Sequence, residues 1–586
     1  MAVYLTVFSI ALPWVGALCV WLAGDRHPKA QHTLATVFSV AAGVVALCLL
    51  PFATQETVIR LPLGSFFGEL TFVPDGMGVF LAAVATSIGS LAVIFSIDYM
   101  HGEAQLGRYY FLVLFFIGAM AGLALTGSFL FLFVFWEITA LCSYALISFY
   151  NDDPKAVAGG IKALIMTQVG GVGLLAGALI AYTNLGTFEI RSFLEQSGSL
   201  PTPLLSLLAY GFLIAAAAKS AQVPFQTWLP DAMEAPTPVS ALIHAATMVN
   251  AGVYLLARFF PAFQAVPDWR TAVIVVGSLS ALLAAIMAML ADDLKRVLAY
   301  STVSQLGYMV YAVGAGGIFA SQFHLFSHAI FKALLFLGAG AVIHAVGTRD
   351  MRQMGQERVR MPFVRLAFIT GSLALAGLPL LNGFWSKELI LEAGLEAGPS
   401  WAYILMLLVA GLTAFYTLRM VWMVFFAPPR SPEAQPVHTH DAPAAMRISL
   451  ALLALGSLAS WIFAGAFSRM LASTLPFNRL HAESTGQYAL AILSAPATWL
   501  VLAVIALGLA AWLWRARLAW IGWLFTPLRF AARRSFGFEW LNRRIVEATQ
   551  NAAASLSILQ TGQLNWNVVG ILCGLIFVLA WLAWGM

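Results

Sequence analysis

Long apolar runs recur from one end of this chain to the other, and they constrain the fold more than any other feature. Of the 586 residues, 61% are hydrophobic and only 10% are charged, whereas about a quarter of the residues in soluble domains carry charge. Each run is about 20 residues long, which is enough for an α-helix to cross a bilayer. The runs predict an all-α polytopic membrane protein with about sixteen transmembrane helices. They begin near Val3, Leu34, Met77, Tyr109, Phe131, Gly159, Pro203, Val239, Thr271, Arg296, Phe323, Leu366, Trp401, Ile448, Ala489 and Val568.

Basic residues are distributed unevenly between the connections, so an orientation follows from the positive-inside rule. Connections after even-numbered spans hold few of them, such as Arg60, Arg270 and Arg479. The pattern predicts cytoplasmic odd-numbered connections and both termini outside, and we expect the inner (cytoplasmic) membrane of a bacterium. The basic residues after odd-numbered spans are Arg26, Lys29, Lys155, Lys295, Arg296, Arg349, Arg352, Arg358, Arg360, Arg515, Arg517, Arg529, Arg533, Arg534, Arg543 and Arg544.

Two spans are interrupted by proline at corresponding places, at Pro224 and Pro379. Proline lacks a backbone donor and clashes with the preceding turn, so each helix is predicted to break there. A lysine lies near each break, Lys219 near the first and Lys387 near the second. Paired interrupted spans are typical of transport sites built from inverted repeats. The predicted divisions are N-terminal spans 1–108, a first repeat 109–259, a second repeat 271–426, C-terminal spans 427–514, a lateral amphipathic segment 515–565 and a last span 566–586.

Ionisable residues occur inside the apolar runs, where a charge costs several kcal/mol and therefore calls for a function. Three of them, His324, His328 and Lys332, follow one another at i, i+4 and i+8, which places them on one helix face. The full set of candidate proton-translocating residues is Glu137, Lys219, His244, His324, His328, Lys332, Lys387 and Glu388.

Each candidate also has a purely structural interpretation. Glu137 and Lys219 can form a static ion pair, His244 can be an ordinary interior histidine, and Lys387 can extend its amine to the membrane interface. The pair His324 and His328 has the spacing of a zinc site, but a lysine on the same face would repel the metal.

Proton handling explains the whole set with one chemistry. Burial disfavours the charged form of lysine and a nearby carboxylate favours it, so moving a glutamate relative to Lys219 would load or unload a proton. Histidine titrates near neutrality and can pass protons between sites. Water in cavities at the broken helices can link these groups.

Composition argues against other chemistries. The four cysteines are scattered in apolar runs without metal-binding spacing, and the chain has no Gly-rich nucleotide motif. We therefore expect no cofactor, no metal and no catalytic redox centre in this chain. The net charge of +5 comes from basic residues beside spans, so it does not indicate nucleic acid as a partner. The expected surroundings are the lipid bilayer and other membrane subunits.

At these residues the sequence resembles the antiporter-like subunits of respiratory complex I and the related Mrp-type sodium/proton antiporters. By layout, the most similar member is the distal, L-type subunit of complex I, with its sixteen spans and lateral helix. The resemblance covers nearly the whole chain. Its most specific stretches are Phe135 to Glu137, Lys219 to Gln222, Asp231 to Met248, Leu294 to Ser301, His328 to Leu334 and Gly383 to Glu388.

The resemblance implies that Glu137 tunes Lys219, that protons reach Lys332 through the histidines, and that Lys387 is the terminal site. The chain also departs from the L-type pattern. Gln168 and Gly171 stand where an arginine and an aspartate are usual, so an ionic link through these positions is absent or different. Several motifs are more similar to the Mrp large subunit, although Asn250 stands where that subunit usually has lysine.

The resulting hypothesis is a proton-translocating membrane subunit of a complex I-type NADH:quinone oxidoreductase. The alternatives are a subunit of an Mrp-type sodium/proton antiporter, with sodium as a second ion, or of a proton-pumping membrane-bound hydrogenase. A non-conducting subunit that only anchors its neighbours is a third class, which the intact ionisable series disfavours. Any enzyme activity would belong to the assembly.

Overall fold

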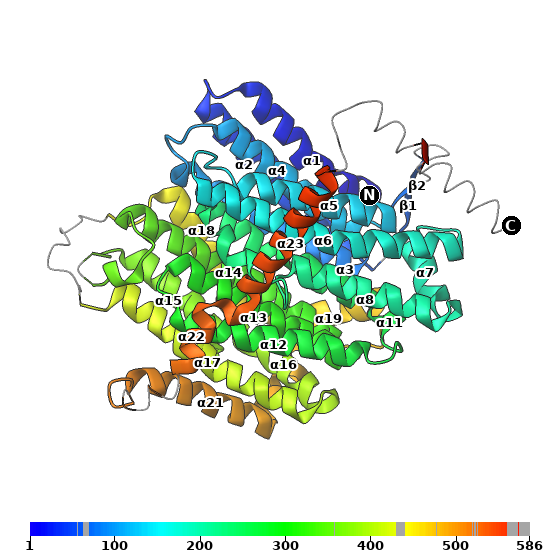
Figure 1. The fold of residues 1–586 in the computed structure, drawn as a ribbon. Helices are drawn as coiled ribbons and strands as arrows, with labels where there is room; N and C mark the ends of the chain where they lie inside the picture. Colours follow the sequence, from blue (N-terminus) through cyan, green and yellow to red (C-terminus); the bar gives the residue numbers. More distant parts are fainter. Residues whose placement is uncertain are drawn as a thin grey trace. The chain divides into compact units, whose positions relative to one another are not determined.

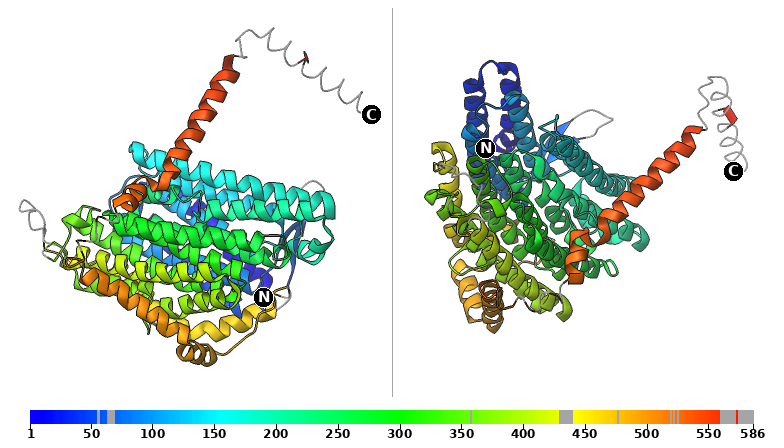
Figure 2. Two further views of the ribbon diagram at one scale, coloured as in Figure 1. Left: turned by 60° about the horizontal axis from the view of Figure 1, so that its bottom comes forward. Right: turned by 60° about the vertical axis from the view of Figure 1, so that its left-hand side comes forward.

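The structure is a computed structural model that describes residues 1–54, 57–62, 69–356, 358–428, 440–475, 477–518, 520, 523, 526–558 and 572–573. It divides into a large unit, Met1–Phe525, and a small one, Thr526–Met586. In the large unit the long helices lie side by side as a bundle (Figures 1 and 2). The N-terminal helices are α1 (Ala2–Ala23), α2 (Pro28–Leu49) and α3 (Gly76–Tyr99), with a hairpin of β1 (Ile59–Pro62) and β2 (Glu69–Phe72) between the last two.

The middle of the chain contributes fourteen further helices in two consecutive groups. The first group is α4 (Leu106–Leu125), α5 (Phe129–Ile147), α6 (Pro154–Leu185), α7 (Ile190–Gln196), α8 (Thr202–Lys219), α9 (Trp228–Asp231), α10 (Thr237–Ala241) and α11 (Met248–Phe263). The second group is α12 (Trp269–Leu290), α13 (Leu294–Ala315), α14 (Ile318–Val346), α15 (Pro362–Ala376), α16 (Asn382–Ala397) and α17 (Ser400–Phe425).

The large unit ends with α18 (Ala444–Ala459), α19 (Ala464–Thr474), α20 (Thr485–Ser494) and α21 (Pro496–Leu513). Short helical turns lie at Leu50–Phe52, Ser197–Ser199, Ala232–Glu234, Met351–Gln353 and Ser460–Phe463. The small unit holds α22 (Thr526–Arg533), a turn at Ser535–Gly537 and α23 (Phe538–Ile558). The 21 residues of α23 correspond to a helix about 32 Å long. Of the predicted last span, 566–586, only residues 572–573 lie among the described residues.

Local sequence explains where several spans begin and end. Asp75, Asp153 and Asp293 precede α3, α6 and α13, and each side chain accepts a backbone N–H from the first turn of its helix. Gly347 ends α14 with a φ of 74°, a left-handed conformation that glycine adopts without steric cost. These signals divide a largely apolar chain into separate helices.

The structure confirms the predicted all-α polytopic membrane fold. Among the described residues, 13 helices are long and apolar enough to cross a membrane. Each of the first fifteen predicted spans begins inside a helix, and Val568, the predicted start of the last one, lies outside the described residues. The figure of about sixteen spans and the pairing of two repeats stay predictions.

Three spans depart from regular α-helix. The chain leaves α8 after Lys219 and passes Pro224 before α9 begins, and it leaves α15 after Ala376 and passes Pro379 before α16 begins. A third irregularity lies at Leu242–Ala246, a π-helical turn between α10 and α11. Such turns are rare and often occur at functional sites. The third irregular segment was not predicted, since no proline or glycine marks it.

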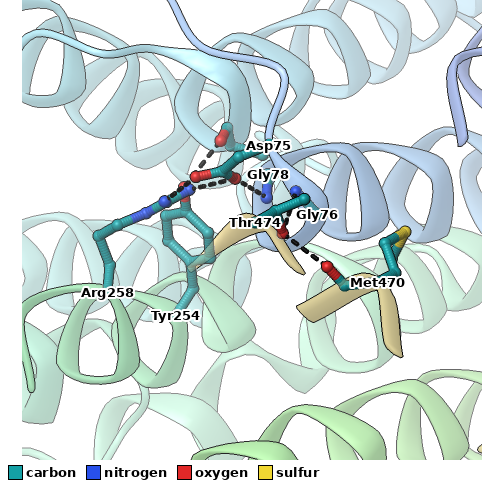
Figure 3. Close-up of polar contacts among 8 residues, drawn as sticks. Asp75, Gly76, Gly78, Tyr254, Arg258, Met470 and Thr474 are labelled. Carbon is teal, nitrogen blue, oxygen red and sulfur yellow. Dashed lines mark hydrogen bonds and ion pairs between the residues drawn. The ribbon is translucent and has the colours of Figure 1, made fainter. Parts of the chain in front are cut away.

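A polar cluster fastens α3 to α11 and α19 at one end of the bundle (Figure 3). Asp75 forms a bidentate ion pair with Arg258, which also donates to the hydroxyl of Tyr254. Tyr254 donates in turn to the carbonyl oxygen of Ala124 at the end of α4, over 2.7 Å. Thr474 accepts the backbone N–H of Gly76, which joins α19 to the start of α3. The cluster thus joins four helices, α3, α4, α11 and α19.

Candidate functional site

Lys219 is the last residue of α8, directly before the first broken segment, and its side chain is fully buried. Its amine donates to the carbonyl oxygen of Trp136 over 2.7 Å and lies 4.8 Å from the centre of the Trp136 ring. The indole face favours a cation, and the carbonyl is a neutral acceptor. Lys219 is therefore held by backbone and ring rather than by a carboxylate.

The broken segment after Lys219 is anchored by its own polar groups. The Trp228 indole donates to the carbonyl of Ala218 over 3.0 Å, and the Gln222 amide donates to Ser220 and Val303 carbonyls. The Ala218 and Ser220 carbonyls belong to the end of the interrupted helix, where carbonyls lack helical partners, and the Val303 carbonyl ties the segment to α13. The break thus has a defined geometry, which fixes the position of the lysine.

Glu137 lies one residue after the carbonyl that holds Lys219, but no ion pair between Glu137 and Lys219 occurs in the described structure. Neither carboxylate oxygen of Glu137 has a hydrogen-bond partner there. One of them instead lies against Gly171 of α6, in the space that a side chain at that position would fill. The static ion pair considered from the sequence is therefore wrong, although Lys219 is close enough to act on the carboxylate electrostatically.

His244 occupies the π-helical turn and is completely buried. Its ring stacks on Phe336 of α14 with 4.9 Å between centroids, and neither ring nitrogen has a hydrogen-bond partner among the described residues. Lys295 and Lys332 are ionisable side chains in its surroundings. A satisfied interior histidine would have its nitrogens bonded. His244 therefore does not fit the ordinary interior histidine considered from the sequence.

The predicted face of α14 is buried along its whole length. His324 contacts the Ser386 hydroxyl at 2.9 Å through Nδ1 and the Gln305 side-chain oxygen at 3.1 Å through Nε2. The His328 ring lies 6.3 Å from the His324 ring between centroids, and its nitrogens are unbonded in the described structure. Within the described ranges no group of three or more His, Cys, Asp or Glu side chains could hold a metal.

Lys332, at the end of that face, follows the pattern of Lys219. Its amine donates to the carbonyl of Leu298, over 3.3 Å, and to the Ser301 hydroxyl, both on α13. Its side chain is fully buried, and Lys387 is the charged group that acts on it.

Lys387 lies on α16, after the second break, and is only 1% exposed. Its amine donates over 2.9 Å to the carbonyl of Leu375, near the C-terminal end of α15, where the helix dipole favours a cation. The Tyr308 ring centre is 5.7 Å away. An extension of Lys387 to the interface is therefore wrong, because the amine turns inward. Glu388 beside it is also buried, at 4% exposure.

Lys295 is a residue that sequence reasoning placed in a cytoplasmic connection. It lies in the first turn of α13 but is only 3% exposed, and its amine donates to the Ala235 carbonyl over 2.6 Å. The next residue, Arg296, points outward and pairs with Asp231 at 3.5 Å. Consecutive helix positions differ by about 100° in direction, so one of two adjacent basic residues can be buried. The adjacency of Lys295 to an apolar run was the available signal.

An ion-pair cluster lies next to Lys295. Arg349 pairs with Glu234 at 2.9 Å and with Asp293 at 3.1 Å, and all three side chains are partly exposed. Their charges act on Lys295. Ion-paired, partly exposed carboxylates thus lie beside a buried lysine.

The four buried lysines share one arrangement, in which the amine donates to a backbone carbonyl and has no ion-pair partner within the described structure. Both an amine and an ammonium can donate to a carbonyl, so the contact survives gain or loss of a proton. An ion pair with a carboxylate would instead favour the charged form. The lysines that share this arrangement are Lys219, Lys295, Lys332 and Lys387.

Comparison with known proteins agrees with this site. Residues 126–413 match the family described as NADH:quinone oxidoreductase/Mrp antiporter, TM, and residues 61–110 match the N-terminus of complex I chain 5. The fold and site thus define an antiporter-like membrane subunit.

Two relatives sharpen this class. The chain is 37% identical over 527 residues to NADH-quinone oxidoreductase subunit L of Mycobacterium tuberculosis, covering 87% of this chain and 82% of the relative. It is 34% identical over 615 residues to subunit L of Escherichia coli, covering 98% of both. The chain belongs to the family of L subunits of NADH-quinone oxidoreductase.

A solved structure gives the same fold. A chain of the Mrp complex from Dietzia sp. DQ12-45-1b superposes with a TM-score of 0.84 and 28% identity, over 99% of this chain and 63% of that chain. The resemblance to both complex I and Mrp subunits stated from the sequence is confirmed.

Proposed function

We propose that this chain translocates protons as the L-type membrane subunit of a complex I-type NADH:quinone oxidoreductase. The observation that carries the proposal is the row of buried lysines, each held by a neutral carbonyl, with histidines of free ring nitrogens between them. Buried charges of this kind are rare in membrane proteins and mark ion pathways.

The proposed path has its loading site at Lys219 and continues through His244 in the π-helical turn. It then follows α14, through His328 and Lys332, with His324 bonded to Ser386 of α16. Lys387, on the same helix as Ser386, is the proposed terminal site, and Glu388 is its neighbouring carboxylate.

Lys295 provides an entry to this path. The partly exposed carboxylates of Glu234 and Asp293 act on Lys295, and the Lys295 amine in turn belongs to the surroundings of the His244 ring. By the positive-inside rule that end of α13 faces the cytoplasm, in the inner membrane of a bacterium, with both termini outside. Protons would therefore enter from the cytoplasm.

A partner subunit is proposed to cover the face of α5 and α6 around Glu137. Apolar side chains there are exposed, among them Val134, Ile165 and Val169, while Glu137 itself is only partly buried. A neighbouring membrane subunit would cover this apolar face, which agrees with an assembly of several antiporter-like subunits.

The test is ion flux in proteoliposomes that contain the purified native assembly, with NADH and quinone added or withheld. We expect proton uptake that requires the redox reaction. Exchange of sodium for protons under an imposed gradient, with no redox requirement, would support the Mrp alternative instead. Proton uptake driven by a hydrogenase reaction would support the third assembly.

A further inference from the structure

We propose that Gly171 is a positioning residue, which gives the Glu137 carboxylate a resting place against α6 and out of ion-pair contact with Lys219. The inference rests on the proposed function, because it concerns how the loading site is controlled. It assigns a role to one of the two positions where this sequence departs from the L-type pattern.

Gly171 faces the carboxylate of Glu137. A methyl group added there would overlap Oε1 of Glu137, and the next atoms it would meet are Cδ of Glu137 at 3.4 Å and Cε2 of Phe133 at 3.8 Å. The closest neighbour is therefore the mobile end of a side chain rather than backbone.

Two other glycines of α6, Gly170 and Gly173, face a different helix from Gly171. A Cβ added to Gly173 would lie 2.5 Å from the carbonyl oxygen of Gly211, and one added to Gly170 would lie 2.6 Å from Cβ of Ala218, both on α8. Those two glycines allow α6 and α8 to pack closely, as small residues do between membrane helices. Gly171 does not serve that contact, because the atoms nearest to it belong to α5. Close packing of α6 and α8 thus explains why Gly170 and Gly173 are glycines. It does not explain Gly171, whose missing side chain makes room for the Glu137 carboxylate.

Polar groups hold the Glu137 carboxylate only weakly. Neither oxygen has a hydrogen-bond partner of normal geometry in the described structure, and Gln168, one turn before Gly171, is the polar side chain of α6 that acts on the carboxylate. The space at Gly171 therefore sets the resting position together with Gln168. The titratable groups facing this region are Lys219 of α8 and Cys142 of α5. Movement of the carboxylate away from Gly171 changes its distance to Lys219, which is the step that loads or unloads the lysine.

The experiment compares Gly171→Ala in the native assembly with the wild type. The fold should persist, since only a flexible side chain has to move. Proton translocation through this chain should fall roughly tenfold, within the range found when a reacting group is misplaced by about 1 Å. The pH profile of translocation should also shift, because the charge on Glu137 now lies at another distance from Lys219. Val172→Ala, on the exposed side of α6, is the matched control and should change neither quantity.

A second variant separates positioning from a general packing defect. Glu137→Asp shortens the side chain by one methylene and so makes room for the added methyl group. Gly171→Ala should therefore cost less than about twofold when introduced into Glu137→Asp, as a double-mutant cycle would measure. Equal cost in both backgrounds, or an unshifted pH profile in Gly171→Ala, would overturn the inference. If Lys219→Ala translocates protons normally, the proposed function itself fails, whatever Gly171→Ala does.

Discussion

Lys219 and Lys387 lie beside the two broken helices, and their surroundings differ in one respect. Both are buried and both donate to a backbone carbonyl, Lys219 to Trp136 and Lys387 to Leu375. The carboxylate near Lys219 comes from another helix, α5, and is not hydrogen-bonded in the described structure. The carboxylate near Lys387 is the next residue of the same helix, Glu388.

This difference separates an adjustable charge from a fixed one. Glu388 and Lys387 are consecutive in α16, so the helix fixes their relative direction at about 100°. Glu137 can change its distance to Lys219 by a change of rotamer. Moving a carboxylate from about 4 to about 8 Å from an ammonium changes their interaction by roughly 2 kcal/mol at an effective dielectric constant near 20. That is enough to change the ratio of protonated to neutral lysine more than tenfold.

The largest effect is expected from removing Lys387, the lysine beside the fixed carboxylate of Glu388. Lys387→Ala should abolish translocation through this chain, by at least about a hundredfold, because the Lys387 amine is the one that bonds the Leu375 carbonyl at the second break in the described structure. Proton uptake per NADH oxidised in proteoliposomes measures it. Thr370→Ala, a partly exposed site on α15, is the control. Normal proton uptake in Lys387→Ala would show that Lys387 is not the terminal site.

The two carboxylates should then differ in importance. Glu137→Gln should slow translocation roughly tenfold, since the lysine loses an adjustable charge, whereas Glu388→Gln should slow it less than about threefold. Both variants keep the side-chain shape, so each serves as the control of the other. Equal effects on the initial rate of proton uptake would contradict the distinction between an adjustable and a fixed carboxylate.

A smaller effect is expected between the two sites. Ser386→Ala removes one of the two hydrogen bonds of His324, a loss of about 1 kcal/mol, and should slow transfer toward Lys387 roughly three- to fivefold. The remaining contact with Gln305 should keep the ring in place. Stopped-flow measurement of proton uptake gives the rate, and a rate unchanged within error would exclude His324 from the path.

The smallest effect on transport is expected from the ion pair of Figure 3. Asp75→Asn should lower the free energy of unfolding of the assembly in detergent by about 1–3 kcal/mol, because a largely buried arginine loses its charged partner. Protons translocated per NADH should stay within about a fifth of the wild-type value in variants that remain assembled. A loss of pumping without a loss of stability would mean that this cluster belongs to the proton path.

Sequence alone predicts the bundle because length and polarity decide which segments cross a membrane. It also predicts the ionisable residues, because each stands out in an apolar run. It did not predict that Lys295 is buried, since the residues around it are those of a connection. It did not predict the π-helical turn at His244 either, because no proline or glycine marks Leu242–Ala246.

The same limit applies to the contacts of each candidate. The sequence places Glu137 and Lys219 on different helices but cannot give the rotamer that turns the carboxylate to Gly171. Nor can it show that carbonyl oxygens, present at every residue, are the partners of the lysines. Those contacts depend on how the helices approach one another.

The central claim is that Lys219 is the proton-loading site of this chain. The most direct test is the number of protons taken up per NADH by proteoliposomes that contain the intact assembly with Lys219→Ala. We expect the assembly to form and oxidise NADH, and the number of protons per NADH to fall by the contribution of this chain. An unchanged number of protons per NADH in a fully assembled Lys219→Ala complex would contradict the claim.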